Sequence, residues 1–237
     1  MTVTDGTPEP AERLAEIEAT HKRLRARTAL LGEAGVRAPS TLPGWSRAHV
    51  LTHLGDLARA FARQALCALD GRVVEVYDGG RPARDAAIER GAPRSVELQL
   101  ASLEDGVTQL EQAWALLGPG DWDRPCGYRG ATLEATQLCW WREVHLHFTD
   151  LDLGYRAEEW SDALARHVVG HLLPRLPADR TTVLYSDGDR WEHGAGAPTT
   201  VHGTRQGLAA WISGRPTARE PKAYGAHNSL PELGSWP

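Results

Sequence analysis

Three pairs of titratable residues in this sequence are each spaced four residues apart. The pairs are His49 and His53, Glu143 and His147, and His167 and His171. Residues four apart lie on the same face of an α-helix, so each pair could present two ligands to one metal ion. A single pair is weak evidence, because this spacing is common by chance. A metal site is therefore predicted only where further ligands join a pair.

Residues 132–151 are predicted to form a helix, and one face of this helix carries both apolar and titratable side chains. At about 100° per residue, Glu143 and His147 share a stripe with Trp140 and Val144. A carboxylate and an imidazole on such a stripe are costly to bury unless they are paired or bind a metal. This helix alone favours the simpler interpretation, which is a buried hydrogen bond between the glutamate and the histidine.

A second predicted helix, which ends near Leu69, supplies another histidine. Its inner stripe consists of Val50, Leu54, Leu57 and Phe61. His53 lies beside this stripe, and a core histidine with one hydrogen-bond partner is the ordinary interpretation. Together, however, His53, Glu143 and His147 are two imidazoles and one carboxylate, a donor set that leaves a fourth zinc position open. Facing helices of a bundle can supply such ligands, so we predict a zinc site at these three residues.

The apolar periodicity predicts the elements that must position these side chains. Four long helices are expected, at residues 12–31, at residues up to about 69, at residues 95–117 and at residues 132–151. Residues 72–93 are punctuated by Gly and Pro and are expected to be irregular, with one short extended piece at 73–77. Four helices of this length favour a four-helix bundle.

The pattern changes after about residue 160. A short helix is expected at 162–173 and another at 208–212, with β-prone runs at 181–185, 190–193 and 199–201. Turn residues between these runs predict antiparallel hairpins. Residues after Pro221 are expected to be a tail packed through Trp236. The fold class is thus predicted to be mainly α with a small α+β part, with domains at 1–158 and 159–237.

Composition excludes several classes of protein. The chain of 237 residues has a net charge of −5, which argues against nucleic-acid binding through a general basic field. It has no apolar run long enough for a membrane span, and its N-terminus lacks the pattern of a signal peptide. Three scattered cysteines cannot form a disulfide framework. We therefore expect a cytoplasmic monomer with a small-molecule substrate, bound to neither membrane nor nucleic acid.

Two segments carry a resemblance to a known family. Residues 39–55, PSTLPGWSRAHVLTHLG, and residues 141–151, WREVHLHFTDL, resemble two motifs of the mycothiol-dependent maleylpyruvate isomerases, within the DinB-like superfamily. Residues 77–94 are a weaker third match, and residues 211–215, WISGR, resemble the C-terminal Trp-x-x-Gly-Arg signature of the family. The resemblance spans nearly the whole chain.

The resemblance implies a DinB-like four-helix bundle followed by a small C-terminal α/β domain. It implies Zn²⁺ held by His53, Glu143 and His147, with Arg215 as the catalytic arginine. It also implies that mycothiol, a low-molecular-weight thiol, is a cosubstrate. The chain departs from the isomerases at Gly55-Asp56 and at His145.

The implied reaction is the conversion of maleylpyruvate to fumarylpyruvate in gentisate-type aromatic degradation. A thiol near pKa 8.5 is mostly protonated at neutral pH, and zinc coordination deprotonates it. The thiolate adds to the double bond of the dicarboxylate, which then rotates before the thiolate leaves. An arginine is the natural partner for a substrate carboxylate. We assign that role to Arg215. Trp45 would pack in the core or wall the pocket, and Asp150 would orient a ligand or cap the helix.

Two other functions stay open at this point. One is a mycothiol S-transferase that acts on another electrophile in detoxification or biosynthesis, with the same zinc and thiol activation. The other is a non-catalytic DinB-like module. A version without metal predicts a hydrogen bond between Glu143 and His147 in place of a zinc site. Cys139, one turn before Glu143, is weighed as a nucleophile, but a buried cysteine is usually a small hydrophobic residue.

Overall fold

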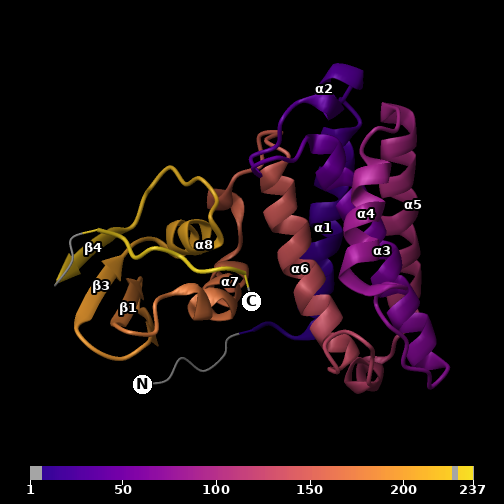
Figure 1. Cartoon of the computed structure of the whole chain (residues 1–237). Helices are drawn as coiled ribbons and strands as arrows, with labels where there is room; N and C mark the ends of the chain where they lie inside the picture. The colour runs from indigo at the N-terminus through magenta and orange to yellow at the C-terminus, as the bar shows by residue number, and fades with distance from the viewer. Residues whose placement is uncertain (1–6, 226–228, 237) are drawn as a thin grey trace. The chain divides into compact units, whose positions relative to one another are not determined.

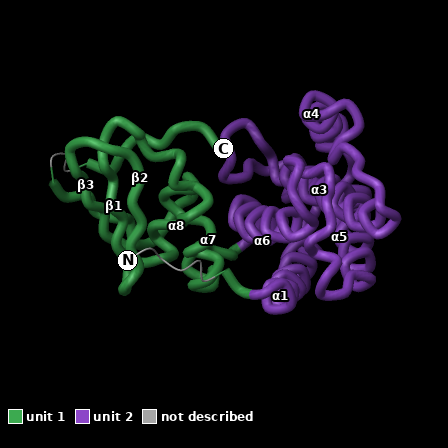
Figure 2. The backbone as a smooth tube through the Cα atoms, turned by 90° about the horizontal axis from the view of Figure 1, so that it is seen from below, with its two compact units in different colours: residues 1–8, 154–237 green, residues 9–153 purple. Residues whose placement is uncertain are grey.

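A computed structural model describes residues 7–225 and 229–236 of the chain. The described residues form two compact units, distinguished by colour in Figure 2. The first unit comprises residues 9–153, and the second comprises the described residues from Gly154 onward together with Thr7 and Pro8.

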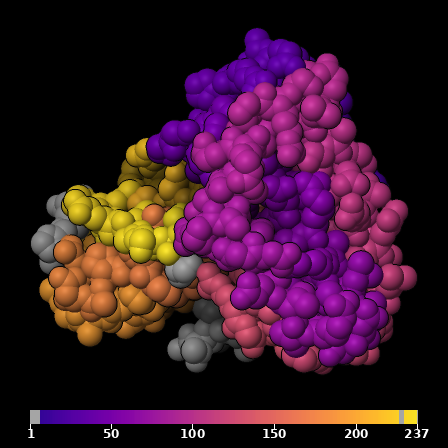
Figure 3. Space-filling view, turned by 45° about the vertical axis from the view of Figure 1, so that its right-hand side comes forward, coloured from indigo at the N-terminus to yellow at the C-terminus, as the bar shows by residue number. Residues whose placement is uncertain are grey.

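The first unit is a bundle of four long helices. These are α1 (Pro10–Thr28), α3 (Arg47–Leu69), α5 (Val96–Ala115) and α6 (Leu133–Asp150). Both α1 and α3 pack against α5 and α6, so the four helices enclose one core (Figure 1). The short helices α2 (Glu33–Arg37) and α4 (Gly80–Gly91) pack on this bundle, and a 3-10 turn, η1 (Pro119–Asp123), precedes α6. The space-filling view shows one face of this unit, where its indigo to magenta atoms form a nearly continuous surface (Figure 3).

Helices α3 and α6 both begin after a loop that is closed in the same way. An isolated β-bridge joins Pro39 to Ser46 before α3, and another joins Pro125 to Thr132 before α6. Ser46 and Thr132 are the N-cap residues of the two helices. Ser and Thr are common at this position. The backbone of an N-cap residue is extended, and a short polar side chain can accept a hydrogen bond from the first turn of the helix. The two loops therefore determine where each of these helices begins.

Helices α3 and α5 approach each other most closely at two glycines. A Cβ atom added at Gly106 of α5 would lie only 2.4 Å from the carbonyl oxygen of Gly55 in α3. Only glycine leaves room for two helix backbones at this separation. Because His53 lies two residues before Gly55, this contact also sets the position of the metal-site histidine on α3.

The segment between α3 and α5 corrects one expectation. Residues 73–77 form no strand, because side chains of α3 take up their backbone groups: Gln64 donates to the carbonyl of Val74 at 3.0 Å. Residues 80–91, expected to be irregular, form α4. Gly79 adopts the left-handed conformation that redirects the chain, and Pro82 lies in the first turn, where it lacks no helical hydrogen bond. The Gly and Pro residues thus begin a helix here.

The second unit combines helices with a small mixed sheet. The helices are α7 (Asp162–Leu172) and α8 (Arg205–Ser213), and the 3-10 turns are η2 (Ala157–Glu159) and η3 (Leu173–Arg175). The strands are β1 (Thr181–Ser186), β2 (Asp189–His193), β3 (Pro198–His202) and β4 (Lys222–Gly225), in the order β2-β1-β3-β4. Helix α7 packs against α8, and α8 contacts β1. The predicted mainly α fold with a small α+β part is confirmed.

Two expectations about this sheet are wrong in detail. The β1–β2 hairpin is antiparallel as predicted, but β3 pairs parallel to β1. Strand β2 ends beside the start of β1. The chain therefore begins β3 at the same end of the sheet as β1, and the two strands run in the same direction. Residues 222–225, expected to be part of a tail, form β4 antiparallel to β3. Further along, the ring of Trp236 lies against the guanidinium groups of Arg175 and Arg215.

Across residues 7–225 and 229–236, no helix combines the length and the apolar character needed to span a membrane.

Gly106→Ala should lower the stability of the first unit. The added methyl group overlaps the backbone of α3, and overpacking of this kind costs about 1–3 kcal/mol. Gly170→Ala in α7 is the matched control, because a Cβ there meets nothing within 4 Å. The control should gain up to about 1 kcal/mol from helix propensity. Urea unfolding followed by circular dichroism measures both effects, and equal stabilities of the two variants would contradict the close contact.

Candidate metal site

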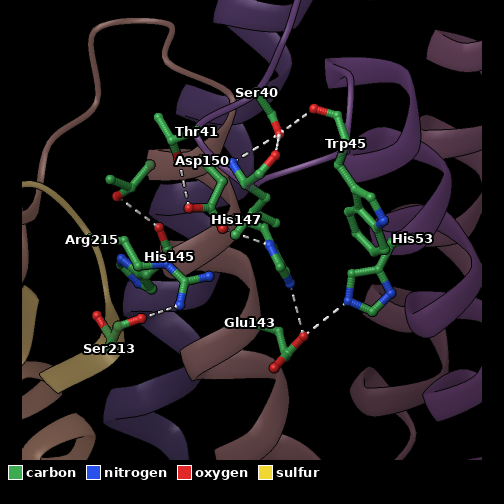
Figure 4. A network of polar contacts seen from close by, with 12 residues as sticks. Ser40, Thr41, Trp45, His53, Glu143, His145, His147, Asp150, Ser213 and Arg215 are labelled. Carbon is green, nitrogen blue, oxygen red and sulfur yellow. Dashed lines mark hydrogen bonds and ion pairs between the residues drawn. The ribbon is translucent and has the colours of Figure 1, made fainter. Parts of the chain in front are cut away.

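The three predicted ligands meet between α3 and α6. The Nε2 atom of His53 lies 3.0 Å from Oε2 of Glu143, and the Nε2 atom of His147 lies 3.2 Å from the same oxygen (Figure 4). The ligand atoms of all three residues lie within 4.8 Å of one another. Among the described residues, His53, Glu143 and His147 form a group of His, Cys, Asp or Glu side chains close enough together to hold a metal ion.

Aromatic rings close one side of this site. The two imidazoles lie edge to face, with ring centroids 4.7 Å apart. The indole of Trp45 stacks on His147 at 6.5 Å and meets His53 edge-on at 5.9 Å. Trp45 comes from the closed loop before α3. Its ring lies against both imidazoles and so covers one side of the site.

The far side of His147 is held by a buried carboxylate. Its Nδ1 atom donates to Oδ2 of Asp150 at 2.9 Å, and Asp150 is fully buried. The hydroxyl of Thr41 donates to the carboxylate of Asp150 at 2.9 Å, and the backbone N–H of Thr41 donates to the backbone carbonyl of Asp150 at 2.9 Å. These contacts hold Nδ1 of His147 as a donor and point Nε2 toward Glu143. Such a carboxylate behind the ring is the usual support of a metal-binding histidine.

The far side of His53 has a different partner. Its Nδ1 atom lies 3.1 Å from a terminal nitrogen of Arg84, which projects from α4. The other terminal nitrogen of Arg84 donates to Asp85 at 2.7 Å. The sequence analysis included Arg84 only within the weak third motif and gave it no role, because α4 was not predicted.

The charges at the site are strongly coupled. Burial alone would raise the pKa of Glu143, but hydrogen bonds from His147 and His53 hold it well below its usual range. Burial would lower the pKa of His147, yet Asp150 and Glu143 raise it to about 9. Burial lowers the pKa of His53 to about 4, despite its contact with Glu143. The metal-free site therefore holds an ionised Glu143, a protonated His147 and a neutral His53.

This donor set fits zinc. Zn²⁺ accepts imidazole nitrogen and carboxylate oxygen, and three protein ligands are typical of its catalytic sites. Metal binding releases the proton of His147, because that ligand must be neutral. The ionised Glu143 supplies negative charge to the site. A bound cation would balance that charge in place of the proton of His147.

The remaining titratable residues of α3 and α6 have other roles. His49 caps its own helix, since its Nδ1 accepts a hydrogen bond from the backbone N–H of Ser46 at 3.1 Å. His145 is buried against α1, 3.2 Å from the hydroxyl of Thr20, and burial lowers its pKa to about 3. Cys139 is buried, and burial raises its pKa to about 11, so its thiol is protonated and unsuited to attack.

The candidate residues of the second unit have their own surroundings. His167 and His171 stack on each other in α7, with centroids 6.3 Å apart, and belong to no three-ligand group. Arg215 follows Gly214, whose left-handed conformation ends α8. The Arg215 side chain is buried, donates to the carbonyl of Ser213 at 2.6 Å and lies 5.2 Å from the ring of Trp236. Its catalytic role stays a prediction.

A cavity of about 350 Å³ opens beside the metal site within the first unit. Its polar lining consists of Arg59, Arg63, Arg84, Arg90, Asp56, Asp78 and Tyr77. Arg84 thus contacts both His53 and this cavity. Sequence reasoning missed the cavity, although Arg59 and Arg63 are four residues apart and share a helix face.

The chain combines a helical bundle that holds a His–Glu–His set with a small α+β unit. Comparison with protein families identifies the class of protein that has this arrangement. Residues 17–152, more than half of the chain, match the family described as the mycothiol maleylpyruvate isomerase N-terminal domain. The chain belongs to this family.

Two solved structures share the fold of the whole chain. They are the mycothiol-dependent maleylpyruvate isomerase and a histidine-to-alanine mutant of that enzyme. Each aligns with a TM-score of 0.88 at 20% identity, over 99% of this chain and 100% of the other. A comparison with curated protein sequences finds no significant match.

The stability of the metal-free protein should fall as the pH rises above neutrality. Because folding raises the pKa of His147 from 6.5 to about 9, its contribution is fully present below about pH 6.5 and is lost as the pH rises through about 9. Asp150→Asn should lower the pKa of His147 and flatten this loss. Histidine NMR titration and urea unfolding of chelator-treated protein measure both. Asp152→Asn is the control, and an unchanged His147 pKa in Asp150→Asn would contradict the contact.

Proposed function

We propose that this chain is a zinc- and mycothiol-dependent isomerase that converts maleylpyruvate to fumarylpyruvate. The observation that carries the proposal is the convergence of His53, Glu143 and His147, with ligand atoms within 4.8 Å, in a chain that belongs to this family. Three protein ligands leave a fourth zinc position for a thiol.

The proposed reaction changes one double bond and leaves no net oxidation. A thiolate bound at this site would supply a reversible nucleophile for one alkene carbon. Its addition would move the alkene electron pair to the conjugated carbonyl and let the former double bond rotate, and its loss would return that pair and restore the double bond in the trans form.

A zinc ion held at this site would lower the pKa of a coordinated thiol and so supply the nucleophile at neutral pH. The residues of the chain do the rest. Asp150 orients the ring of His147, and Glu143 provides an ionised ligand whose pKa is already low. Trp45 covers the two imidazoles and excludes water from one side. Exclusion of water strengthens the electrostatic attraction between the ligands and a cation.

The substrate carboxylates need a cationic partner, for which we propose Arg215. It belongs to the segment that resembles the C-terminal signature of the family, and Gly214 turns the chain immediately before it. The planar guanidinium can bind a carboxylate through two parallel hydrogen bonds. It could also stabilise the enolate that forms on addition.

The purified protein should contain about one zinc ion per chain, because one three-ligand site is present. His53→Ala, Glu143→Gln and His147→Ala should each lose most of this zinc. His167→Ala, which removes a histidine outside the group, should keep it. Elemental analysis measures the content. Full zinc retention in all three ligand variants would refute the site, and its absence from the native protein would favour the metal-free module.

Isomerisation of maleylpyruvate should require both zinc and mycothiol. A spectrophotometric assay with chelator-treated and zinc-restored protein, each with and without mycothiol, measures this dependence. Zinc and thiol binding without isomerisation would favour an S-transferase that acts on another electrophile. A rate independent of any thiol would refute the proposed mechanism.

Arg215→Ala should lower turnover by roughly 10²-fold, the usual effect of losing one group that stabilises transition-state charge. Arg215→Lys should also be impaired, because it keeps the charge but loses the planar fork. Zinc content should be unchanged in both variants, since none of the three ligands is altered. Arg219→Ala is the control for a nearby exposed arginine. Normal turnover in both Arg215 variants would exclude this residue from the site.

A further inference from the structure

The two histidines of the metal site have opposite partners on their outer nitrogens. His147 presents Nδ1 to a carboxylate, whereas His53 presents Nδ1 to the guanidinium of Arg84 at 3.1 Å. A guanidinium has donors only, so Nδ1 of His53 must accept this hydrogen bond. The proton of the neutral His53 ring is then on Nε2, where it faces Oε2 of Glu143 at 3.0 Å.

This arrangement conflicts with metal binding at His53. A neutral histidine that binds a metal through Nε2 carries its proton on Nδ1 and normally donates it to a carboxylate, a carbonyl or water. With that proton in place, Nδ1 and Arg84 would be two donors facing each other at hydrogen-bond distance. One of the two groups must therefore move when Nε2 takes a metal.

The surroundings indicate that Arg84 is the group that moves. His53 is 3% exposed and lies on α3, close to the tight contact with α5. The side chain of Arg84 is 20% exposed, projects from the peripheral helix α4 and lines the cavity of about 350 Å³. Its neighbour Asp85 already accepts its other terminal nitrogen. Arg84 therefore has both a partner and space outside the metal site.

We propose that Arg84 is a positioning residue that competes with the metal for His53. In the metal-free protein it holds His53 in the tautomer that cannot bind a metal through Nε2. Metal entry shifts the proton to Nδ1 and releases the guanidinium toward the cavity. This inference rests on the zinc site of the proposed function and concerns its occupancy, which that function does not address.

The release couples the metal site to the neighbouring cavity. The cavity is lined by four arginines and two aspartates, so it suits an anionic ligand. An anion that bound the released Arg84 would favour the metal-loaded state, and by linkage it would raise the affinity for the metal by the same factor. The guanidinium of Arg84 would then be available to a ligand in the cavity only when the metal is bound.

The test compares zinc affinities, measured by competition with a chromophoric chelator. Arg84→Gln should bind zinc at least about tenfold more tightly than the native chain, because no hydrogen bond to a charged group has to be broken first. Arg90→Gln is the matched control: it removes the same charge from the same helix and cavity, and no hydrogen bond or ion pair joins Arg90 to His53 in the described structure. Its affinity should stay within about threefold of the native value, which would exclude a general charge effect.

A second measurement reads the tautomer of His53 directly. Long-range proton–nitrogen NMR spectra, assigned with His53→Gln, should show the proton on Nε2 in the metal-free chain and on Nδ1 after zinc is added. A metal-free His53 with its proton on Nδ1, or equal zinc affinities of Arg84→Gln and the native chain, would overturn the competition while leaving the zinc site intact. Failure of both chains to bind zinc would overturn the site itself and this inference with it.

Discussion

A partly buried carboxylate between two imidazoles is the interaction on which this site depends. Both imidazoles lie within 3.2 Å of one oxygen of Glu143, and these partners offset the cost of taking its charge out of water. Each of the two rings is held in turn by its outer nitrogen, through Asp150 or Arg84. Because every member has its own partner, the donor atoms stay together without a metal. The three side chains are therefore held together, although the proton on Nε2 of His53 has to move before that nitrogen can bind a cation.

The bundle brings these side chains together through features of its backbone. Helices α3 and α6 both start at a loop closed by a β-bridge, so the distance from each helix start to its ligands is defined. Contact between Gly55 and Gly106 then holds α3 against α5. Thr41, in the loop before α3, binds the carboxylate at the end of α6. The two ligand-bearing helices are thus joined at the level of the site by polar contacts as well as by packing.

The two histidines are supported unequally at their outer nitrogens. A carboxylate behind His147 favours the metal-binding tautomer, whereas a guanidinium behind His53 favours the other. Arg84 also lines the cavity beside the site, so one side chain belongs to both places. The bundle thus holds the three candidate ligands, and the cavity beside them is lined by four arginines.

The sequence alone predicted the four long helices, because helical periodicity is local, and it placed Glu143 and His147 on one helix face because they are four residues apart. It did not predict α4, the parallel pairing of β3 or the strand β4. Each of these depends on which distant segment the chain meets, and a local pattern does not encode that partner. The contact of Arg84 with His53 joins residues 31 positions apart, through a helix that the sequence did not predict. Tertiary structure alone decided that Nδ1 of His53 meets a donor, because the path of α4 puts the guanidinium of Arg84 beside that ring.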